Sequence, residues 1–361
     1  MANKNLNAAR EAKKDEFYTQ LADIEHELRH YRKHFMGKTV LCNCDDPYES
    51  NFFKFFALNF NAYGLKKLIC TCYNGSPVQG NELLIDWGDF EQSPKKIAYK
   101  VEITEVKDMN GDGRTDLTDV RILIQNDKNI LTILKENGDF RSRECIELLK
   151  EADIVVTNPP FSLFREYVAQ LMKYEKKFLI IGNQNNVTYK EIFPLLQNDR
   201  MWLGMNAGSQ IFEVPLDFIR QNTFVAKDGK KYAKFGNICW FTNLDNKKRY
   251  EELILYRTYS PDYYPKYDNY DAIDVGRISD IPCDYYGLMG VPITFMIDYS
   301  PNQFEVLGLT DRNSPLCTRI YTRADAKNYS DLNRRSVLLV NGKYKMLFPK
   351  ILIRRRQKSN Q

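Results

Sequence analysis

The spacing of hydrophobic residues predicts one amphipathic helix and then alternating strands and helices. The helix covers about residues 20–35, where apolar side chains recur at helical spacing: Leu21, Ile24, Leu28, Tyr31 and Phe35. Short apolar runs rich in β-branched residues follow, with helical patterns between them, and they begin at Thr39, Lys67, Ile154 and Phe178. Strand–helix–strand units of this length indicate a parallel sheet, so the expected fold class is α/β.

The later part of the chain has a different pattern. Three runs after residue 200 are typical of antiparallel strands: 201–204, 210–214 and 235–243. From residue 256 tyrosine, proline and aspartate crowd the chain, and short β-like pieces follow at 292–297, 304–308, 318–322, 336–340 and 343–353. We therefore expect two regions, 1–255 and 256–361, with an insertion in the first at about 93–127 that contains a hairpin.

Composition bounds the class of protein. The 361 residues, 43% hydrophobic and 13% aromatic, are enough for a large core. No apolar run approaches the roughly 20 residues of a membrane span, and the N-terminus lacks a signal-peptide pattern, so we expect a cytoplasmic protein with no membrane partner. Eight cysteines in a chain of this length are not typical of a disulfide scaffold.

Charge is distributed unevenly along the chain. The net charge is +5, but residues 300–361 hold 13 Lys and Arg against 4 Asp and Glu. Residues 256–299 hold 3 against 7. A basic segment joined to a neutral body indicates a polyanionic partner, and the alternative is a solvated basic surface.

The most specific motif is Asn158-Pro159-Pro160-Phe161, which follows the apolar strand Ile154–Val156. Proline cannot donate a ladder hydrogen bond, so the strand ends there. Asn158 is thereby placed at the carboxyl end of a strand, where open α/β sheets bind ligands. Its side-chain oxygen and the Pro159 carbonyl can accept from an exocyclic amino group, and Phe161 offers a ring for stacking. This arrangement suits an enzyme that holds an extrahelical adenine.

An acidic loop in the insertion matches the spacing of a calcium-binding loop. Its oxygen-bearing positions 1, 3, 5, 9 and 12 are Asp108, Asn110, Asp112, Asp116 and Asp119, and Arg114 at position 7 would supply its carbonyl. The strand-like flanks, including Val120–Gln125, resemble an isolated or dockerin-like loop. We expect a structural Ca²⁺, and the alternative is an acidic turn in a hairpin.

Several motifs in one order resemble the adenine-specific DNA methyltransferases of the EcoRI modification methylase family. These motifs lie at 15–20, 45–47, 139–140 and 158–161, and the resemblance covers most of the chain. It implies a Rossmann-like, S-adenosylmethionine (AdoMet) dependent fold with a seven-stranded, mostly parallel sheet. It also implies the order cofactor, catalysis and C-terminal target recognition, with double-stranded DNA as the partner.

The resemblance assigns roles to individual residues. The catalytic motif is Asn158, Pro159, Pro160 and Phe161, and the residues assigned to the cofactor are Phe17, Tyr18, Thr19, Asp45, Asp46, Asp139 and Phe140. Two features depart from the usual pattern. The Gly-rich first loop is replaced by the segment 44–47, and no acid ends the second strand, where Thr71 or Tyr73 would have to contact the ribose.

The expected reaction is transfer of a methyl group from AdoMet to the amino group of a flipped adenine. All three histidines lie between residues 26 and 34, which excludes a histidine-dependent hydrolase further along the chain. The alternatives are an RNA or protein-glutamine methyltransferase, a DNA-binding protein without activity, and a nuclease with Mg²⁺ on Asp45 and Asp46. We expect a monomer of bacterial or phage origin, which a cognate restriction endonuclease can accompany.

Overall fold

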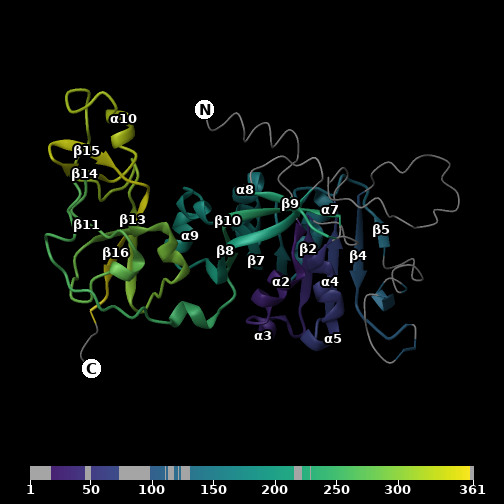
Figure 1. Cartoon of the computed structure of the whole chain (residues 1–361). Helices are drawn as coiled ribbons and strands as arrows, with labels where there is room; N and C mark the ends of the chain where they lie inside the picture. Colours follow the sequence, from purple (N-terminus) through teal and green to yellow (C-terminus); the bar gives the residue numbers. More distant parts are fainter. Residues whose placement is uncertain are drawn as a thin grey trace. The chain divides into compact units, whose positions relative to one another are not determined.

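The computed structural model describes residues 18–44, 50–72, 98–109, 111–112, 118–120, 122, 131–214, 222–227 and 229–357. The chain divides into two compact units (Figure 1). The first consists of Met1–Asn183 and Gly204–Leu244, and the second of Gln184–Leu203 and Asp245–Gln361. This division falls at 244/245, whereas the change in sequence texture suggested 255/256. No helix among the described residues is long and apolar enough to cross a membrane.

The first unit is built on one large sheet. Its helices are α2 (Leu21–Leu28), α3 (Arg32–Phe35), α4 (Asn51–Leu58), α5 (Phe60–Tyr63), α7 (Arg143–Glu151) and α8 (Phe164–Lys173). Its strands are β1 (Tyr18–Thr19), β2 (Thr39–Asn43), β3 (Lys67–Thr71), β4 (Tyr99–Ile103), β5 (Leu131–Ile133), β6 (Ile154–Thr157), β7 (Lys177–Asn183), β8 (Trp202–Val214), β9 (Thr223–Val225) and β10 (Lys231–Thr242).

The sheet is mixed, with parallel strands at its centre. In the part of the chain that the structure describes, it has ten strands, in the order β1-β8-β10-β7-β6-β2-β3-β4-β5 with β9 paired to β10. β3, β2, β6 and β7 are parallel, whereas β4 and β10 run antiparallel beside them. The α/β class is therefore confirmed, but the sheet is larger and less parallel than the seven strands expected. β1 and β9 are too short to leave a pattern, and β4, which lies in the expected insertion, extends the sheet itself together with β5.

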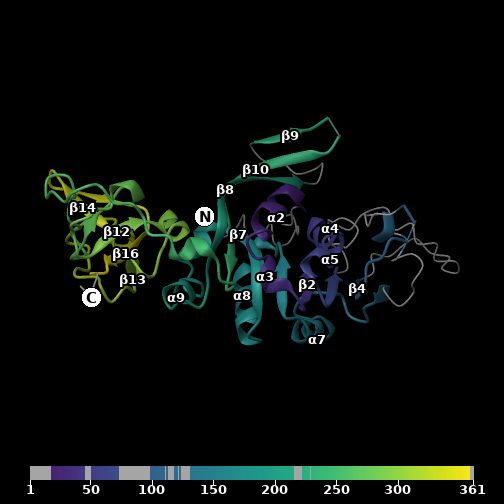
Figure 2. The ribbon, with the colours of Figure 1, turned by 90° about the horizontal axis from the view of Figure 1, so that it is seen from below.

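Helices cover both faces of the central strands. All residues of β2 and β6 are buried, as is typical of strands with helices on both sides. One face packs on α2 to α5 in a cluster that includes Phe35, Phe52 and Phe56. On the other face Gly182 approaches Phe164 of α8 so closely that a Cβ atom would lie 2.6 Å from its ring. Figure 2 shows α7 and α8 on the opposite side of the sheet from α2 and α4.

The helix expected at 20–35 is divided into α2 and α3, and α2 holds a buried carboxylate. Glu27 is 0% exposed. Its Oε1 accepts from the Met205 N–H at 2.8 Å and from the Tyr31 hydroxyl at 3.0 Å. Its Oε2 accepts from the backbone and side chain of Asn206 at 2.9 and 2.7 Å. Burial raises the pKa of Glu27 and these hydrogen bonds oppose the rise. The carboxylate thus joins α2 to β8, and Gly204 leaves room for it.

The second unit contains a smaller sheet and a separate hairpin. Its helical pieces are η2 (Gln184–Thr188), α9 (Phe193–Gln197), η3 (Lys247–Tyr250), η4 (Ile278–Asp280), η5 (Ile293–Ile297) and α10 (Tyr329–Leu332). Its strands are β11 (Ile273–Asp274), β12 (Met289–Pro292), β13 (Phe304–Leu309), β14 (Val337–Val340), β15 (Lys343–Met346) and β16 (Lys350–Arg355). The sheet has the order β11-β12-β16-β13, and β14 pairs with β15.

Two strands expected in the second unit were wrong. Residues 293–297 form η5. The prediction failed there because a short apolar run fits a strand or a buried helical turn equally well. Residues 318–322 form no strand, and Arg319 there pairs with Asp268 and Asp325 at 2.9 and 2.7 Å.

We predict that Glu27→Gln destabilises the protein by about 3 kcal/mol, because a buried polar atom loses its partner. Each oxygen of Glu27 faces a backbone N–H, so either orientation of a glutamine amide would set its NH₂ group against a donor. Urea unfolding of the variant measures the loss. The matched control is Glu25→Gln, which changes an exposed carboxylate of the same helix. Equal stabilities of the two variants would contradict the role given to Glu27.

Candidate active site

The Asn-Pro-Pro-Phe turn lies at the carboxyl edge of the parallel strands, as expected. β6 ends at Thr157, and Asn158 follows with 5% of its surface exposed. The Thr157 hydroxyl donates to the Asn43 carbonyl, at the end of the neighbouring strand β2. Pro159 and Pro160 are buried, and Phe161 is half-buried where the turn η1 (Phe161–Leu163) begins. The turn therefore presents the Asn158 amide at a rigid strand end.

Tyr167 of α8 connects this strand end to the expected cofactor pair at 139–140. Its hydroxyl donates to Oδ1 of Asn43. Its ring meets the Phe140 ring edge to face, with centroids 5.0 Å apart. The next turn of α8 adds a hydrogen bond of 2.9 Å from Gln170 Nε2 to the Phe140 carbonyl. Phe140 is thus held beside the ends of β2 and β6.

The loop that carries Asp139 forms a hydrogen bond with a buried cysteine of α7. Gly138 has a left-handed φ of 72°. The Cys145 thiol donates to the Gly138 carbonyl at 3.4 Å. Burial raises the pKa of Cys145, so the group remains a neutral thiol, and the Thr71 hydroxyl contacts it from the end of β3. Thr71, a candidate for the ribose, therefore lies close to the Asp139 loop, while Tyr73 lies outside the described residues.

Asp139 itself is paired with an arginine. Arg141 donates to both carboxylate oxygens, from Nε at 2.8 Å and from Nη2 at 2.7 Å. The same guanidinium reaches Glu166 of α8 at 3.0 Å and lies over the Phe140 ring, 5.1 Å from its centroid. Hydrogen bonding to Asp139 raises the pKa of Arg141. A cofactor amino group that binds Asp139 must share the carboxylate with Arg141.

The N-terminal cofactor motif is described only in part. Tyr18 and Thr19 form β1, in which Thr19 pairs with Phe212 of β8. The Thr19 carbonyl accepts from Asn51 Nδ2 at 2.7 Å, and Ser50 caps α4 by accepting from the Phe53 N–H. Thr19 is therefore tied to the helix that follows the first loop. Its hydroxyl is buried with no hydrogen-bond partner among the described residues, which fits a site that a polar ligand completes. Phe17, Asp45 and Asp46 lie outside the described residues.

The structure adds residues that the sequence motifs did not single out: Asn43, Thr157, Tyr167 and Arg141. Two signals were available in the sequence. Tyr167 occupies an inward position of α8 otherwise filled by apolar residues, and a buried tyrosine hydroxyl needs a partner. Asn43 is the one amide within the apolar strand β2.

The expected calcium ligands are also described only in part. Asn110, Arg114 and Asp116 lie outside the described residues. Asp119 is 0% exposed and accepts from the Met109 N–H at 2.7 Å, and Asp108 accepts from the Gly111 N–H at 2.7 Å. Residues 118–120 are helical, so the strand expected at Val120–Gln125 does not begin there. Among the described residues no group of three metal-ligating side chains occurs.

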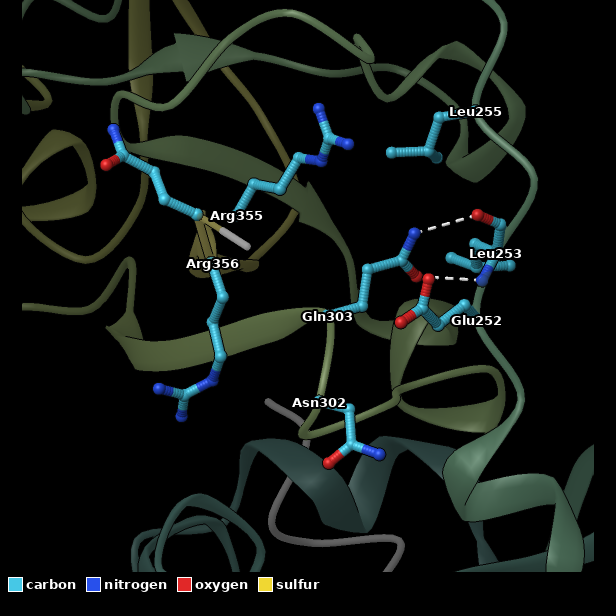
Figure 3. Close-up of a pocket in the computed structure, with 8 residues that line it drawn as sticks. Glu252, Leu253, Leu255, Asn302, Gln303, Arg355 and Arg356 are labelled. Atoms are coloured by element: carbon cyan, nitrogen blue, oxygen red, sulfur yellow. Dashed lines mark hydrogen bonds between the residues drawn. The ribbon is translucent and has the colours of Figure 1, made fainter. Parts of the chain in front are cut away.

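A second polar site lies in the second unit, in a pocket of about 170 Å³ (Figure 3). Gln303 forms its wall and holds the Leu253 backbone with two hydrogen bonds, of 2.7 and 2.8 Å. Arg356 Nε donates to the Pro301 carbonyl at 2.8 Å, and Arg355 packs its guanidinium on the Tyr286 ring at 5.2 Å. Neither arginine pairs with a carboxylate of a described residue. Glu252 also lines the pocket, so its charged side chains are two arginines and one carboxylate.

The α/β sheet and the Asn-Pro-Pro-Phe turn at its carboxyl edge are typical of the methyltransferases that act on amino groups. Comparison with known proteins identifies the family within this class of methyltransferases. The family model described as "Adenine-specific methyltransferase EcoRI" matches residues 5–356. The Type II methyltransferase M.EcoRI of Escherichia coli is 47% identical over 311 residues, which cover 84% of this chain and 89% of the relative.

Two further relatives match almost from end to end. M.MgeORF184P of Mycoplasma genitalium is 36% identical, over 98% of this chain and 99% of its own. M.MpnI of Mycoplasma pneumoniae is 35% identical, over 98% of both chains. No solved structure matches the chain. The chain belongs to the EcoRI family of adenine-specific methyltransferases, so the resemblance is confirmed. It is an enzyme that methylates DNA with AdoMet as methyl donor.

We predict that Tyr167→Phe lowers kcat for methyl transfer about tenfold, because the ring contact with Phe140 remains but the bond to Asn43 is lost. Tyr167 is a positioning residue, so KM for AdoMet and the unfolding free energy are measured together with kcat. Stability should fall by about 1 kcal/mol. Tyr174→Phe, at the end of the same helix, is the control and should change none of these values. A variant with full kcat would show that the hydroxyl positions nothing.

Proposed function

We propose that Asn158 and the Pro159 carbonyl hold the amino group of the target adenine, with Phe161 stacked on its ring. The observation that supports this most is the linked set of contacts from Phe140 through Tyr167 to Asn43 and the end of β6. Because Phe140 and the Asn-Pro-Pro-Phe turn are linked at one edge of one sheet, these contacts support a shared site for the cofactor and the base. An amide and a carbonyl that accept from the amino group keep the nitrogen lone pair available for attack.

We assign the cofactor to the residues around this edge. Tyr18, Thr19, Asp139 and Phe140 would hold it, and the resemblance adds Phe17, Asp45 and Asp46, which lie outside the described residues. AdoMet supplies a methyl group on a sulfonium centre. The protein's part is to place the target nitrogen in line with that methyl and to exclude water. No strong base is required, because the amino nitrogen gives up a proton only as it becomes positively charged.

We propose that the second unit recognises the DNA sequence. Its basic side chains are mostly on the surface, and they include Arg312, Arg323, Lys327, Arg334, Arg335, Lys343, Lys345 and Arg354. The β14–β15 hairpin turns at Asn341 and Gly342, both with positive φ, and exposes Leu339 and Val340 beside its lysines. A two-stranded ribbon of this kind fits the major groove of DNA, and arginines such as Arg355 and Arg356 suit phosphates or guanine edges.

The partners follow from this role. Its relatives are named Type II methyltransferases, and we propose that this enzyme likewise protects a DNA site against a cognate restriction endonuclease, as a monomer. Because its substrate would be bacterial or phage DNA, we place the enzyme in the cytoplasm.

The test of the catalytic assignment is Asn158→Ala. We expect methyl transfer to duplex DNA to fall at least about 100-fold, because a pre-organised acceptor at the reacting group is lost. AdoMet binding, measured by calorimetry, should change less than about threefold, since Asn158 is assigned to the base and not to the cofactor. Incorporation of labelled methyl and detection of N6-methyladenine provide the rate.

Asn61→Ala is the control, because it removes a surface amide of the same unit. Retained transfer by Asn158→Ala would overturn the assignment. Transfer by the wild type to RNA or to protein, but not to duplex DNA, would overturn the proposed substrate.

We further propose that residues 108–119 bind a structural Ca²⁺ through the side chains of Asp108, Asn110, Asp112, Asp116 and Asp119 and the carbonyl of Arg114. Asp119 is buried within a helical turn and accepts from the Met109 N–H at the start of the loop, which supports a loop that closes on itself. Ca²⁺ at about 100 times its Kd should raise the unfolding free energy by about 2.7 kcal/mol. Differential scanning fluorimetry should show this shift with Ca²⁺ and not with Asp112→Asn. The exposed Asp331→Asn serves as the control, and a wild type that is insensitive to Ca²⁺ would exclude the site.

A further inference from the structure

The β9–β10 hairpin carries basic and aromatic side chains that the proposed reaction does not use. β9 pairs antiparallel with the first part of β10, so that Tyr232 lies opposite Phe224. Figure 2 shows this two-stranded ribbon projecting from the sheet of the first unit. We call residues 222–227 and 229–236 the arm.

The arm leaves the sheet at the edge that holds the Asn-Pro-Pro-Phe turn. The second part of β10 pairs antiparallel with β7, with Ile238 opposite Asn183, the last residue of β7. Residues of β10 before Ile238 must therefore extend beyond the carboxyl end of β7. β6 runs parallel to β7 and ends at Thr157, directly before Asn158. The arm and the candidate catalytic turn thus share one edge of one sheet.

The two faces of the arm differ. Ala233 and Phe235 are 1% and 8% exposed and belong to the hydrophobic core. Since side chains alternate along a strand, Tyr232 and Lys234 lie on the opposite face. There the Phe224 ring stacks on Tyr232, with centroids 5.7 Å apart and planes at 23°. Phe224 is nevertheless 47% exposed, so the stacked pair has an open side.

A cavity of about 480 Å³ lies next to this stacked pair. Phe224 and Tyr232 line it from the arm, Ile211 from β8, and Gln20 and Asp23 from the segment that follows β1. Gln20 comes directly after Thr19 of the expected cofactor motif. The open side of the arm therefore borders a shallow, open hollow of the same unit.

The arm is strongly basic. It contains Lys227, Lys230, Lys231 and Lys234, and the only acid between residues 222 and 236 is Asp228. Lys227 and Lys234 are exposed, and neither forms an ion pair with a described residue. Lys234 is four residues from Ile238, about 13 Å along the strand at the usual rise per residue. Positive charge is thus held a short distance outside the catalytic edge.

We propose that the arm is a second DNA-binding element, located on the catalytic unit, which holds the duplex backbone beside the flipped adenine. Lys227 and Lys234 would contact phosphates, and Phe224 would pack against the sugars. Phosphate contacts fix the position of a protein on a duplex without reading its sequence. The inference rests on the proposed function, because it requires duplex DNA at the Asn158 edge.

The test is the double variant Lys227→Gln, Lys234→Gln. Each phosphate contact contributes about 0.9 to the slope of log binding constant against log salt, so the slope should fall by about two and binding should weaken about tenfold. The probe is a duplex that contains the sequence in which wild-type enzyme produces N6-methyladenine. Fluorescence anisotropy from about 50 to 200 mM salt gives the slope.

The matched control is the double variant Lys33→Gln, Lys66→Gln, which removes two exposed lysines of the same unit. These lysines precede β2 and β3, and the amino ends of those parallel strands lie away from the carboxyl edge that holds the Asn-Pro-Pro-Phe turn. Its slope should equal that of the wild type. If the wild type methylates duplex DNA but the arm variant keeps the full slope, the arm inference is overturned and the proposed function stands. If the wild type transfers no methyl to duplex DNA, the proposed function fails first, and the inference with it. Unchanged AdoMet binding and melting temperature show that the arm variant is folded.

Discussion

Two hydroxyl groups donate to Asn43 at the end of β2: Thr157 to its carbonyl and Tyr167 to its side chain. They come from the strand and the helix on either side of the Asn-Pro-Pro-Phe turn. Because all three groups are buried, these bonds form where water does not compete with them. The positions of β2, β6 and α8 at the carboxyl edge are therefore coupled, and the turn cannot move independently of the first strand.

This coupling explains how a short polar motif acts at a defined place. Methyl transfer needs the donor and the amino nitrogen in line, and misplacement by an ångström is costly. The turn contains two prolines and is followed at once by the short helix η1, so its backbone has little conformational freedom. Phe140 packs on Tyr167, the same residue that binds Asn43. Family membership establishes the reaction, and the buried contacts give the turn a fixed position at the edge where we propose that the reaction occurs.

The amount that sequence could predict differed between the parts of the chain. A helix such as α7 can be predicted from its sequence, because its helical pattern and its serine cap are local features. β2, β3 and β6 were found for the same reason. The size of the sheet was missed, since two-residue and three-residue edge strands such as β1 and β9 depend on pairing with distant strands. Nothing in the sequence distinguishes Glu27 from the exposed charged residues of the same helix, and only its contacts with β8 show why it is buried.

The missing Gly-rich loop has a physical counterpart in the structure. AdoMet folds commonly use glycine after the first strand, where the chain must turn sharply. Here Cys44, the residue after β2, adopts φ 76° in the left-handed region, at a cost of about 1 kcal/mol or more for a residue with a Cβ. The surrounding contacts must hold that conformation, and the bonds from Thr157 and Tyr167 to Asn43 fix the residue directly before it. The turn that glycine would permit elsewhere is imposed here by the packing of α8 and β6.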